Sequence, residues 1–276
     1  MNEQRLILEF LDRETARIDK LIAEKQTFIK LLKEKRQALI SHVVTKGLNP
    51  NVKMKDSGIE WIGEVPEHWG HGKIKHIARI SNGATPHRDT AEFWEGGTIG
   101  WLNSSKVNDV YIEHADQFIT EYALQKTSVQ PVKPNDLVIA ITGEGQTRGR
   151  VAICKTDATI NQHLASISIS SEDVDVEFLF YWLTSQYSRI RYESSGAGST
   201  KGAITCTDVG LYPLPMPPFE EQKFIVEAVK QKLCKYDSLM DETDQSIKLL
   251  QEHRTALISA AVTGKIDVRD FKKETA

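Results

Sequence analysis

The sequence predicts an α+β fold in which a globular domain lies between two long helices that pair as an antiparallel coiled coil. Three observations lead to this prediction. A segment near the N-terminus recurs near the C-terminus, and both copies have the apolar spacing of a long helix. The residues between the copies alternate short β-type runs with polar loops.

The repeat aligns without a gap at an offset of 218 positions, so that residues 29–41 return as residues 247–259 and Asp19 corresponds to Asp237. Of the 46 positions from Glu3 to Leu48, 19 are identical to their counterparts. A repeat that occurs only twice, at the two ends of a different middle, is not the pattern of a solenoid. It indicates two equivalent arms around one central domain.

Each arm is predicted to be one long helix, because no Pro or Gly interrupts the first copy before Gly47. Apolar residues recur every seven positions, which is typical of a coiled coil. If the central domain is compact and its two ends are neighbours, the arms run antiparallel, and Leu32 and Leu39 are expected to be buried near the domain. The seven-residue register contains Leu11, Ile18, Leu32 and Leu39 in the first copy and Val229, Tyr236, Leu250 and Leu257 in the second.

Composition predicts a soluble cytoplasmic protein. The longest apolar run, residues 137–141, is far shorter than the ~20 residues that span a bilayer, and the N-terminus is charged where a signal peptide would be apolar. Cys154, Cys206 and Cys234 are too few and too widely spaced for a disulfide framework or a cysteine zinc site.

Charge is uneven along the chain. Residues 52–218 carry 15 basic and 20 acidic side chains, and so the middle is acidic. Sequence-independent DNA binding depends on many Lys and Arg contacts to phosphate. If the middle domain reads nucleic acid, partner proteins must supply much of the electrostatic attraction.

Three domains are predicted, with boundaries at residues 1–51, 52–218 and 219–276. In the middle domain, residues 178–192 have the pattern of a helix. The proline-rich residues 212–219 are interpreted as a stiff strap that leads into the second arm. Strands are predicted at residues 72–80, 129–142, 150–154 and 165–170.

Three loops resemble catalytic motifs only in part. Residues 216–219, Met-Pro-Pro-Phe, lack the polar residue with which DNA amino-methyltransferases hold the target amine. Residues 143–149 have Gly spacing unlike a dinucleotide fingerprint and are followed by a predicted strand, so a polar hairpin tip is favoured. Residues 196–202 do not match a P-loop either.

No catalytic constellation is recognisable, but several loops carry residues that suit base edges: Arg and Lys for guanine, Asn and Gln for adenine, and Thr methyls for thymine. Each such loop could equally be an ordinary polar loop. The candidate DNA-binding residues are Thr85, His87, Arg88, Gln146, Thr147, Arg148, Arg150, Asn161, Gln162, His163, Thr200 and Lys201.

Three segments together resemble one family. Both arms end in Arg-x-Ala-Leu-Ile-Ser-x-x-Val-Thr, the domain opens with Asp-Ser-Gly-Ile-Glu-Trp-Ile-Gly-Glu-Val-Pro-Glu-His-Trp, and it closes with Pro-Leu-Pro-x-Pro-Pro-x-Glu-Glu-Gln. This combination resembles the specificity subunit of type I restriction-modification enzymes. That family usually has two target-recognition domains, whereas this chain has one, and so it resembles a half-length or fragment subunit.

The resemblance implies a non-catalytic reader of double-stranded DNA, active in host defence, that docks adenine methyltransferase subunits and, through them, restriction and translocase subunits. S-adenosylmethionine, ATP and Mg²⁺ are then expected on the partner subunits and no cofactor on this chain. The long helices are expected to set the spacing between two half-sites, and a homodimer through the arms is expected, with no membrane partner.

Two other classes of function remain as alternatives. A coiled-coil adaptor would bind protein only and leave no sequence-specific footprint on DNA. A free-standing DNA methyltransferase would bind S-adenosylmethionine, which the missing cofactor loop and the methionine at position 216 make the weaker alternative.

Overall fold

A computed structural model describes residues 2–143, 145–195 and 202–268. The chain forms two compact units, of which the first is made from residues 1–38 and 230–276 and the second from residues 39–229. The division falls inside both long helices, whereas the boundaries predicted from the sequence follow the helix ends. Each unit is described by itself.

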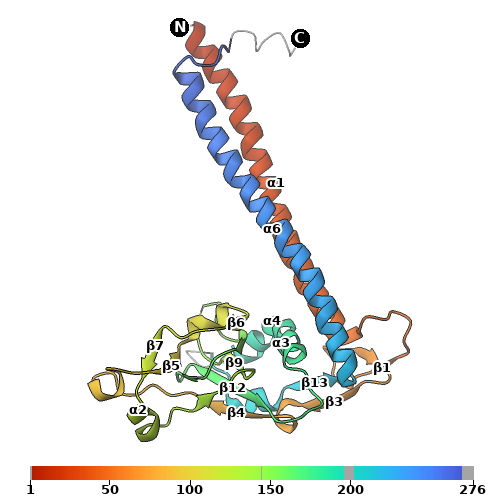
Figure 1. The fold of residues 1–276 in the computed structure, drawn as a ribbon. Coiled ribbons are helices and arrows are strands. Elements are labelled where there is room, and N and C mark those ends of the chain that lie inside the picture. Colours follow the sequence, from red (N-terminus) through yellow and green to blue (C-terminus); the bar gives the residue numbers. More distant parts are fainter. Residues whose placement is uncertain (1, 144, 196–201, 269–276) are drawn as a thin grey trace. The chain divides into compact units, whose positions relative to one another are not determined.

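The first unit is a pair of helices, formed by most of α1 (Asn2–Lys46) and α6 (Phe219–Val262). The two helices lie side by side (Figure 1), which confirms the two long helices expected from the repeat. The side chains of the two helices that are buried in this unit follow one stripe of each helix: Ile18 and Leu32 on α1, and Leu233, Thr243, Ile247 and Ala261 on α6.

Two ion pairs fix the direction of this pairing. Arg36 Nη1 lies 2.9 Å from Asp237 Oδ1, and Arg254 Nε lies 2.8 Å from Asp19 Oδ1. Because the earlier residue of α1 meets the later residue of α6, the helices are antiparallel. The two pairs also involve equivalent positions of the repeat, since Arg36 corresponds to Arg254 and Asp19 to Asp237. The repeat therefore gives the helix pair a local twofold symmetry.

The seven-residue register holds along most of α1 but shifts at its end. Leu32 is buried as expected, whereas Leu39 is only half-buried, and the buried positions become Ile40, Val43 and Val44. An α-helix has 3.6 residues per turn, and so a strict seven-residue stripe drifts by ~20° per heptad. This drift accounts for the change from Leu39 to Ile40.

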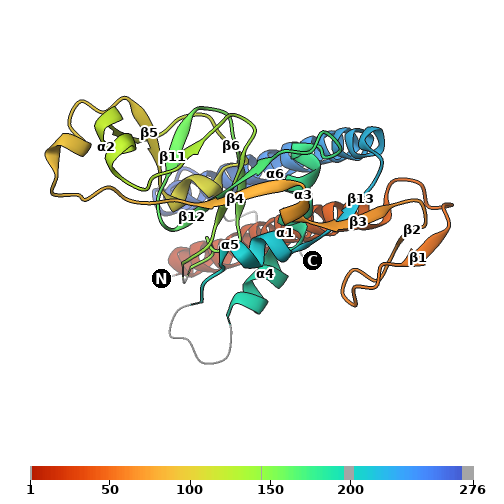
Figure 2. The same ribbon diagram turned by 90° about the horizontal axis from the view of Figure 1, so that it is seen from below.

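The second unit contains a five-stranded sheet, a four-stranded sheet and two two-stranded ribbons. The five-stranded order is β4-β12-β9-β10-β6, the four-stranded order is β7-β5-β11-β8, and the ribbons are β1-β2 and β13-β3. The four-stranded sheet and the β1-β2 ribbon lie at opposite ends of this unit (Figures 1 and 2). The strands are β1 (Met54–Asp56), β2 (Glu64–Pro66), β3 (Gly70–Lys73), β4 (Ala78–Asn82), β5 (Ile99–Leu102), β6 (Tyr111–Ile112), β7 (Gln117–Ile119), β8 (Pro131–Val132), β9 (Leu137–Ala140), β10 (Val151–Cys154), β11 (Ala158–Ile160), β12 (Leu164–Ile169) and β13 (Pro213–Met216).

Short helices connect and cover these strands. The predicted helix over residues 178–192 is present, but it is divided at Gln186 into α3 and α4, because Gln186 leaves the helical conformation with φ −91° and ψ 2°. The helices of this unit are α2 (Glu121–Lys126), α3 (Val176–Ser185), α4 (Tyr187–Ser194), α5 (Cys206–Leu211) and the 3-10 helices η1 (Ile74–His76), η2 (Ala91–Phe93) and η3 (Ser104–Asn108).

The predicted strands at 150–154 and 165–170 are confirmed as β10 and β12, whereas the longer runs are interrupted. The run at 72–80 contains η1, and the run at 129–142 turns at Asn135, whose φ is 73°. The proline-rich strap is also more ordered than expected, because its residues 213–216 form β13 and pair antiparallel with β3. Residues 143–149 connect the antiparallel strands β9 and β10, as expected for a hairpin tip.

The core of this unit lies on both faces of the central strands. One face packs against α3. On the other, a buried cluster joins residues of the five-stranded sheet, such as Val138, to residues of the four-stranded sheet, such as Leu102. Every residue of β9 and β10 is buried. Strands that are buried on both faces have continuous apolar sequences, as these two strands do. Trp182 and Phe178 of α3 are fully buried, and the Trp182 indole N–H donates to Pro213 O at 2.9 Å.

The end of α1 and the start of α6 meet within the second unit. Gly47 ends α1 with a φ of +74°, the left-handed conformation that favours glycine at a helix C-terminus. A Cβ at Gly47 would lie 3.3 Å from Trp69 and 3.4 Å from Glu221. The buried Trp69 indole donates to Glu221 Oε1 at 3.1 Å, and His68 Nε2 lies 2.7 Å from Glu221 Oε2. Glu221 thus ties the opening motif of the domain to the second helix.

Candidate nucleic-acid interface

Loops from four parts of the sequence meet at one end of the five-stranded sheet. Ala84 N donates to Ile160 O at 2.9 Å, Ile141 N donates to His163 O at 2.9 Å, and Ile204 N donates to Ile141 O at 2.8 Å. These backbone bonds join the loops after β4 and β9, the turn before β12 and the segment before α5. The structure therefore brings together most of the regions in which candidate DNA-binding residues were predicted.

Four side chains in these loops form a continuous hydrogen-bonded chain. Thr85 Oγ1 donates to Gln162 Oε1, Gln162 Nε2 lies 3.1 Å from His163 Nε2, and His163 Nδ1 lies 2.6 Å from Thr142 Oγ1. Three of these residues are predicted candidates, and Thr142 was missed. Thr142 directly precedes the Gly-rich hairpin tip, and this position could have marked it as a candidate in the sequence. We call these four residues the Thr85–Thr142 chain.

Asn161 has a structural position in this interface. Its side chain is 5% exposed, and its Oδ1 accepts a hydrogen bond from His163 N at 3.0 Å. Gly83 packs directly against it, because a Cβ at Gly83 would stand 2.1 Å from Asn161 O. Asn161 therefore shapes the turn that presents Gln162 and His163.

The hairpin tip is held by side chains from α4 and from the tip itself. Tyr187 Oη donates to Gln146 O at 2.5 Å, and Arg191 Nη1 donates to Gly145 O at 2.6 Å. Arg150 donates through Nε to Gln146 O at 3.0 Å and through Nη1 to Asn108 Oδ1 at 3.0 Å. The exposed Gln146 side chain thus projects from a fixed backbone.

Two other candidates on this tip are less accessible. Thr147 is half-buried. Arg148 is 6% exposed, and its guanidinium packs against Gly202, where a Cβ would stand 1.8 Å from Nη1. Its buried Nε has no hydrogen-bond partner among the described residues. A guanidinium enclosed in this way cannot reach a base edge without a movement of the tip.

An aromatic platform supports the loop of His87 and Arg88. The exposed Arg88 guanidinium lies 3.9 Å from the centre of the Trp94 ring and 4.6 Å from that of Trp101, and its Nη1 donates to Gln117 Oε1 at 2.9 Å. The Trp94 indole donates to His87 O and the Trp101 indole to Ala84 O, both at 3.1 Å. Both tryptophans were missed in the sequence. Trp94 and Trp101 follow Arg88 by 6 and 13 residues, and this closeness to a basic loop could have indicated that they support it.

The remaining candidates, Thr200 and Lys201, lie outside the described residues. Burial raises the pKa of the Cys154 thiol and, with a hydrogen bond to Glu177, that of the Tyr111 hydroxyl. Both groups therefore stay neutral at neutral pH and add no charge near the sheet. The interface presents an amide, an imidazole, hydroxyls and guanidinium groups, which suits recognition by hydrogen bonds rather than bond-breaking chemistry.

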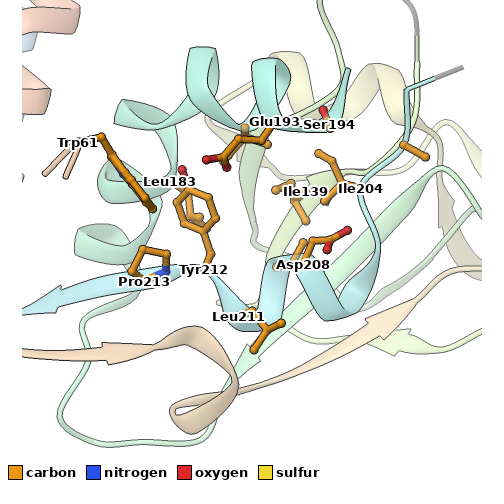
Figure 3. A pocket seen from close by; sticks show the side chains of 13 residues that line it. Trp61, Ile139, Leu183, Glu193, Ser194, Ile204, Asp208, Leu211, Tyr212 and Pro213 are labelled. Carbon is orange, nitrogen blue, oxygen red and sulfur yellow. The ribbon is translucent and has the colours of Figure 1, made fainter. Parts of the chain in front are cut away.

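A cavity of about 650 Å³ lies between α4, α5 and Trp61 (Figure 3). Its lining is mostly apolar and includes two carboxylates, those of Glu193 and Asp208. Glu193 pairs with Arg189 at 2.8 Å, and Asp208 caps α5 through Thr205. The mostly apolar lining and the two carboxylates make the cavity unsuited to the phosphates of nucleic acid.

Within the described ranges, no group of three or more His, Cys, Asp or Glu side chains is placed to hold a metal ion. None of the helices described here combines the length and the apolar character that crossing a bilayer requires.

Comparison with known proteins agrees with this geometry. Residues 66–249 match the family described as the type I restriction modification DNA specificity domain. This match covers well over half of the chain, and the chain therefore belongs to that family. The assignment places the chain among specificity subunits and not among the catalytic subunits of these systems.

Two curated relatives illustrate the relationship. The chain is 25% identical over 244 residues to the EcoR124I/EcoR124II specificity subunit of Escherichia coli, covering 87% of this chain and 53% of that protein. It is 25% identical over 279 residues to the MjaVIII specificity subunit of Methanocaldococcus jannaschii, covering 98% of this chain and 62% of that protein. The chain thus spans a little over half the length of these relatives.

Solved structures share the fold. A chain from a study of complex assembly and conformational transition in a type I R-M system aligns with a TM-score of 0.73 at 18% identity, covering 94% of this chain and 58% of that chain. The HsdS subunit from Thermoanaerobacter tengcongensis aligns with a TM-score of 0.58 at 17% identity, covering 96% and 59%. The predicted α+β class with two long helices is therefore confirmed.

Proposed function

We propose that this chain reads one half of a bipartite target in double-stranded DNA as the specificity subunit of a type I restriction-modification system. The observation that carries the proposal is the Thr85–Thr142 chain, which holds the exposed side chains of Gln162 and His163 in place. Its support is the membership of the chain in a DNA specificity family. A reader of this kind needs no catalytic centre of its own.

Affinity for DNA is proposed to depend on partner subunits. The acidic balance of residues 52–218 disfavours strong binding to phosphates by this chain alone. Adenine methyltransferase subunits docked on the chain would supply basic surface and S-adenosylmethionine. Restriction and translocase subunits, reached through them, would supply ATP and Mg²⁺.

A second copy of the chain is proposed to bind the helix pair. Leu21 and its repeat counterpart Leu239 are 38% and 41% exposed, and Leu31 and its counterpart Leu249 are 55% and 65% exposed. The twofold axis that exchanges two antiparallel helices is perpendicular to the plane containing both helix axes. Residues at equivalent positions of the repeat therefore lie on the same side of that plane. Positions ten apart lie about 80° apart around a helix of 3.6 residues per turn, so the two leucines of each helix lie on the same half of its surface. We call these four residues the leucine ridge.

A twofold dimer would present two equivalent nucleic-acid interfaces, one on each chain, and would read a gapped inverted repeat. In this arrangement the long helices act as a spacer that sets the number of unread base pairs between the half-sites. Figure 1 shows both helices as continuous ribbons through the first unit, and their bounds give 45 residues for α1 and 44 for α6. Near-equal lengths support such a role.

The test is to express the chain with its methyltransferase partner, map modified adenines in the DNA and footprint the purified complex. A specific bipartite motif and a protected site are expected. Methylation without a motif would contradict the proposal. A complex with no footprint would favour the adaptor, and binding of S-adenosylmethionine by the isolated chain would favour a free-standing methyltransferase.

A further inference from the structure

We infer that Gln162 reads one adenine of the half-site and that Thr85 and His163 are positioning residues that hold its amide. The inference rests on the proposed function and deepens it, because it names one base and one residue. It follows from the hydrogen bonds that the Gln162 side chain makes within the protein and from those that remain available.

A carboxamide has two N–H donors and an oxygen with two lone pairs. One lone pair of Gln162 Oε1 accepts from Thr85 Oγ1, and one N–H of Nε2 is directed at His163 Nε2, 3.1 Å away. One donor and one acceptor lone pair remain. Gln162 is itself exposed, so both remaining groups are open to a ligand.

This remaining pair matches one base in the major groove. Adenine presents an N7 acceptor and an N6 donor, which one amide can contact together. Guanine presents two acceptors, N7 and O6, and a held amide with a single free donor can satisfy only one of them. Cytosine and thymine each offer a single hydrogen-bonding group there. Adenine is therefore the base that uses both free groups of Gln162.

Neighbouring segments limit the rotation of the amide. If Gln162 donates to His163 Nε2, the ring proton lies on Nδ1 and donates to Thr142 Oγ1 at 2.6 Å. All three hydrogen bonds then run in one direction, an arrangement in which each bond strengthens the next. The turn is fixed as well, because Leu164 N donates to Asn161 O at 3.1 Å. An amide held before binding loses less entropy when it meets a base.

The three candidate arginines are held by other contacts. Arg148 is buried, Arg150 is bonded to Gln146 O and Asn108, and Arg88 is stacked on Trp94. Among the described candidates, Gln162 combines exposure, two internal hydrogen bonds and a complete remaining donor–acceptor pair. This combination distinguishes it from a polar side chain that is merely on the surface.

The test compares the methylation motif and the binding preference of the complete subunit, in complex with its methyltransferase, for wild type and four variants. Gln162→Ala is expected to lose discrimination at one A·T position by about 5- to 150-fold, the range of a bidentate base contact, with the other positions unchanged. Thr85→Val is expected to relax the same position, and Thr85→Ser, which keeps the hydroxyl, to restore it. The matched control is Gln125→Ala on α2, an exposed glutamine outside the Thr85–Thr142 chain.

The base preference at a single position is a readout that a general loss of folding would not give. An unchanged motif in Gln162→Ala, a uniform loss at all positions, or a loss at a G·C position would each overturn the inference. A change at the same position in Gln125→Ala would overturn it as well. If the wild-type complex itself shows no sequence preference, the proposed function fails and the inference fails with it.

Discussion

Gly83 is the residue at which the loops of the candidate interface approach most closely. A Cβ at this position would stand 2.1 Å from Asn161 O and 2.4 Å from Ile160 O, which are backbone atoms and cannot rotate away. We expect Gly83→Ala to lower the free energy of unfolding by about 1–3 kcal/mol, as overpacking does. Denaturant unfolding of the purified chain measures this change.

Gly145 provides the control for that substitution. Nothing lies within 4 Å of the position that its Cβ would take, so Gly145→Ala should leave the unfolding midpoint nearly unchanged. Equal effects of the two substitutions would show that close packing at Gly83 does not stabilise the loops.

At the same scale, the sequence indicates which side chains have the chemistry to contact a base, but it does not indicate which of them are accessible. The rule that Asn, Gln, Arg and Thr suit base edges selected loops most of which lie together in the structure, because the rule depends on the chemistry of each side chain alone. Whether a side chain is free depends on contacts between segments far apart in the chain. Arg148 is enclosed by Gly202, and Asn161 is buried in its own turn. Neither contact has a signal in the local sequence.

At the scale of elements, Glu221 joins the opening motif of the domain to the start of α6. We expect Glu221→Ala to lower the free energy of unfolding by about 1–3 kcal/mol, because the indole N–H of Trp69, a residue only 1% exposed, would lose its acceptor. His68 would lose its partner as well. Thermal or denaturant unfolding measures the loss.

Glu220 is the neighbouring control, since it is a surface residue paired only with Lys223 at 3.0 Å among the contacts described. Surface pairs of this kind contribute ~0–1 kcal/mol. Glu220→Ala should therefore cost less than Glu221→Ala, and the opposite order would contradict the role given to Glu221.

The elements differ in how far the sequence reveals them. The long helices are readable because an ungapped repeat and a sustained apolar period reinforce each other over many turns. Strands of two to four residues, such as β6 and β8, carry too few positions for a period to show. The strand β13 was hidden by its prolines, which can lie in a two-stranded ribbon because not every residue there must donate to a neighbour.

At the scale of the whole molecule, the leucine ridge predicts self-association. Leu21→Lys combined with Leu239→Lys would place four charges in a twofold interface, where burying unpaired charge is costly. We expect this variant to sediment as a monomer at concentrations at which the wild-type chain is a dimer. Leu8→Lys is the control, because Leu8 is 60% exposed but is not on the ridge. Dissociation by Leu8→Lys alone, or a persistent dimer in the ridge variant, would contradict the assignment.

The spacing role of the helices leads to a prediction about the DNA target. If the helix pair sets the distance between half-sites, inserting one heptad after Lys25 and one after Thr243 should lengthen the gap and leave the half-sites unchanged. Seven residues keep the apolar stripe in register and add ~10.5 Å to each helix. That length corresponds to about three base pairs at ~3.4 Å each.

The insertion has to be made in both helices, because the ion pairs Arg36–Asp237 and Arg254–Asp19 depend on a matched antiparallel register. An insertion in α1 alone separates Asp19 from Arg36 by one extra heptad, and the two pairs can no longer form together. The single insertion is therefore the control, and it should destabilise the helix pair. Mapping modified adenines for the double insertion gives the gap directly. In a dimer the increase depends on how the two chains overlap, but it is not zero, so a folded, methylating variant with an unchanged gap would show that the helices do not set the spacing.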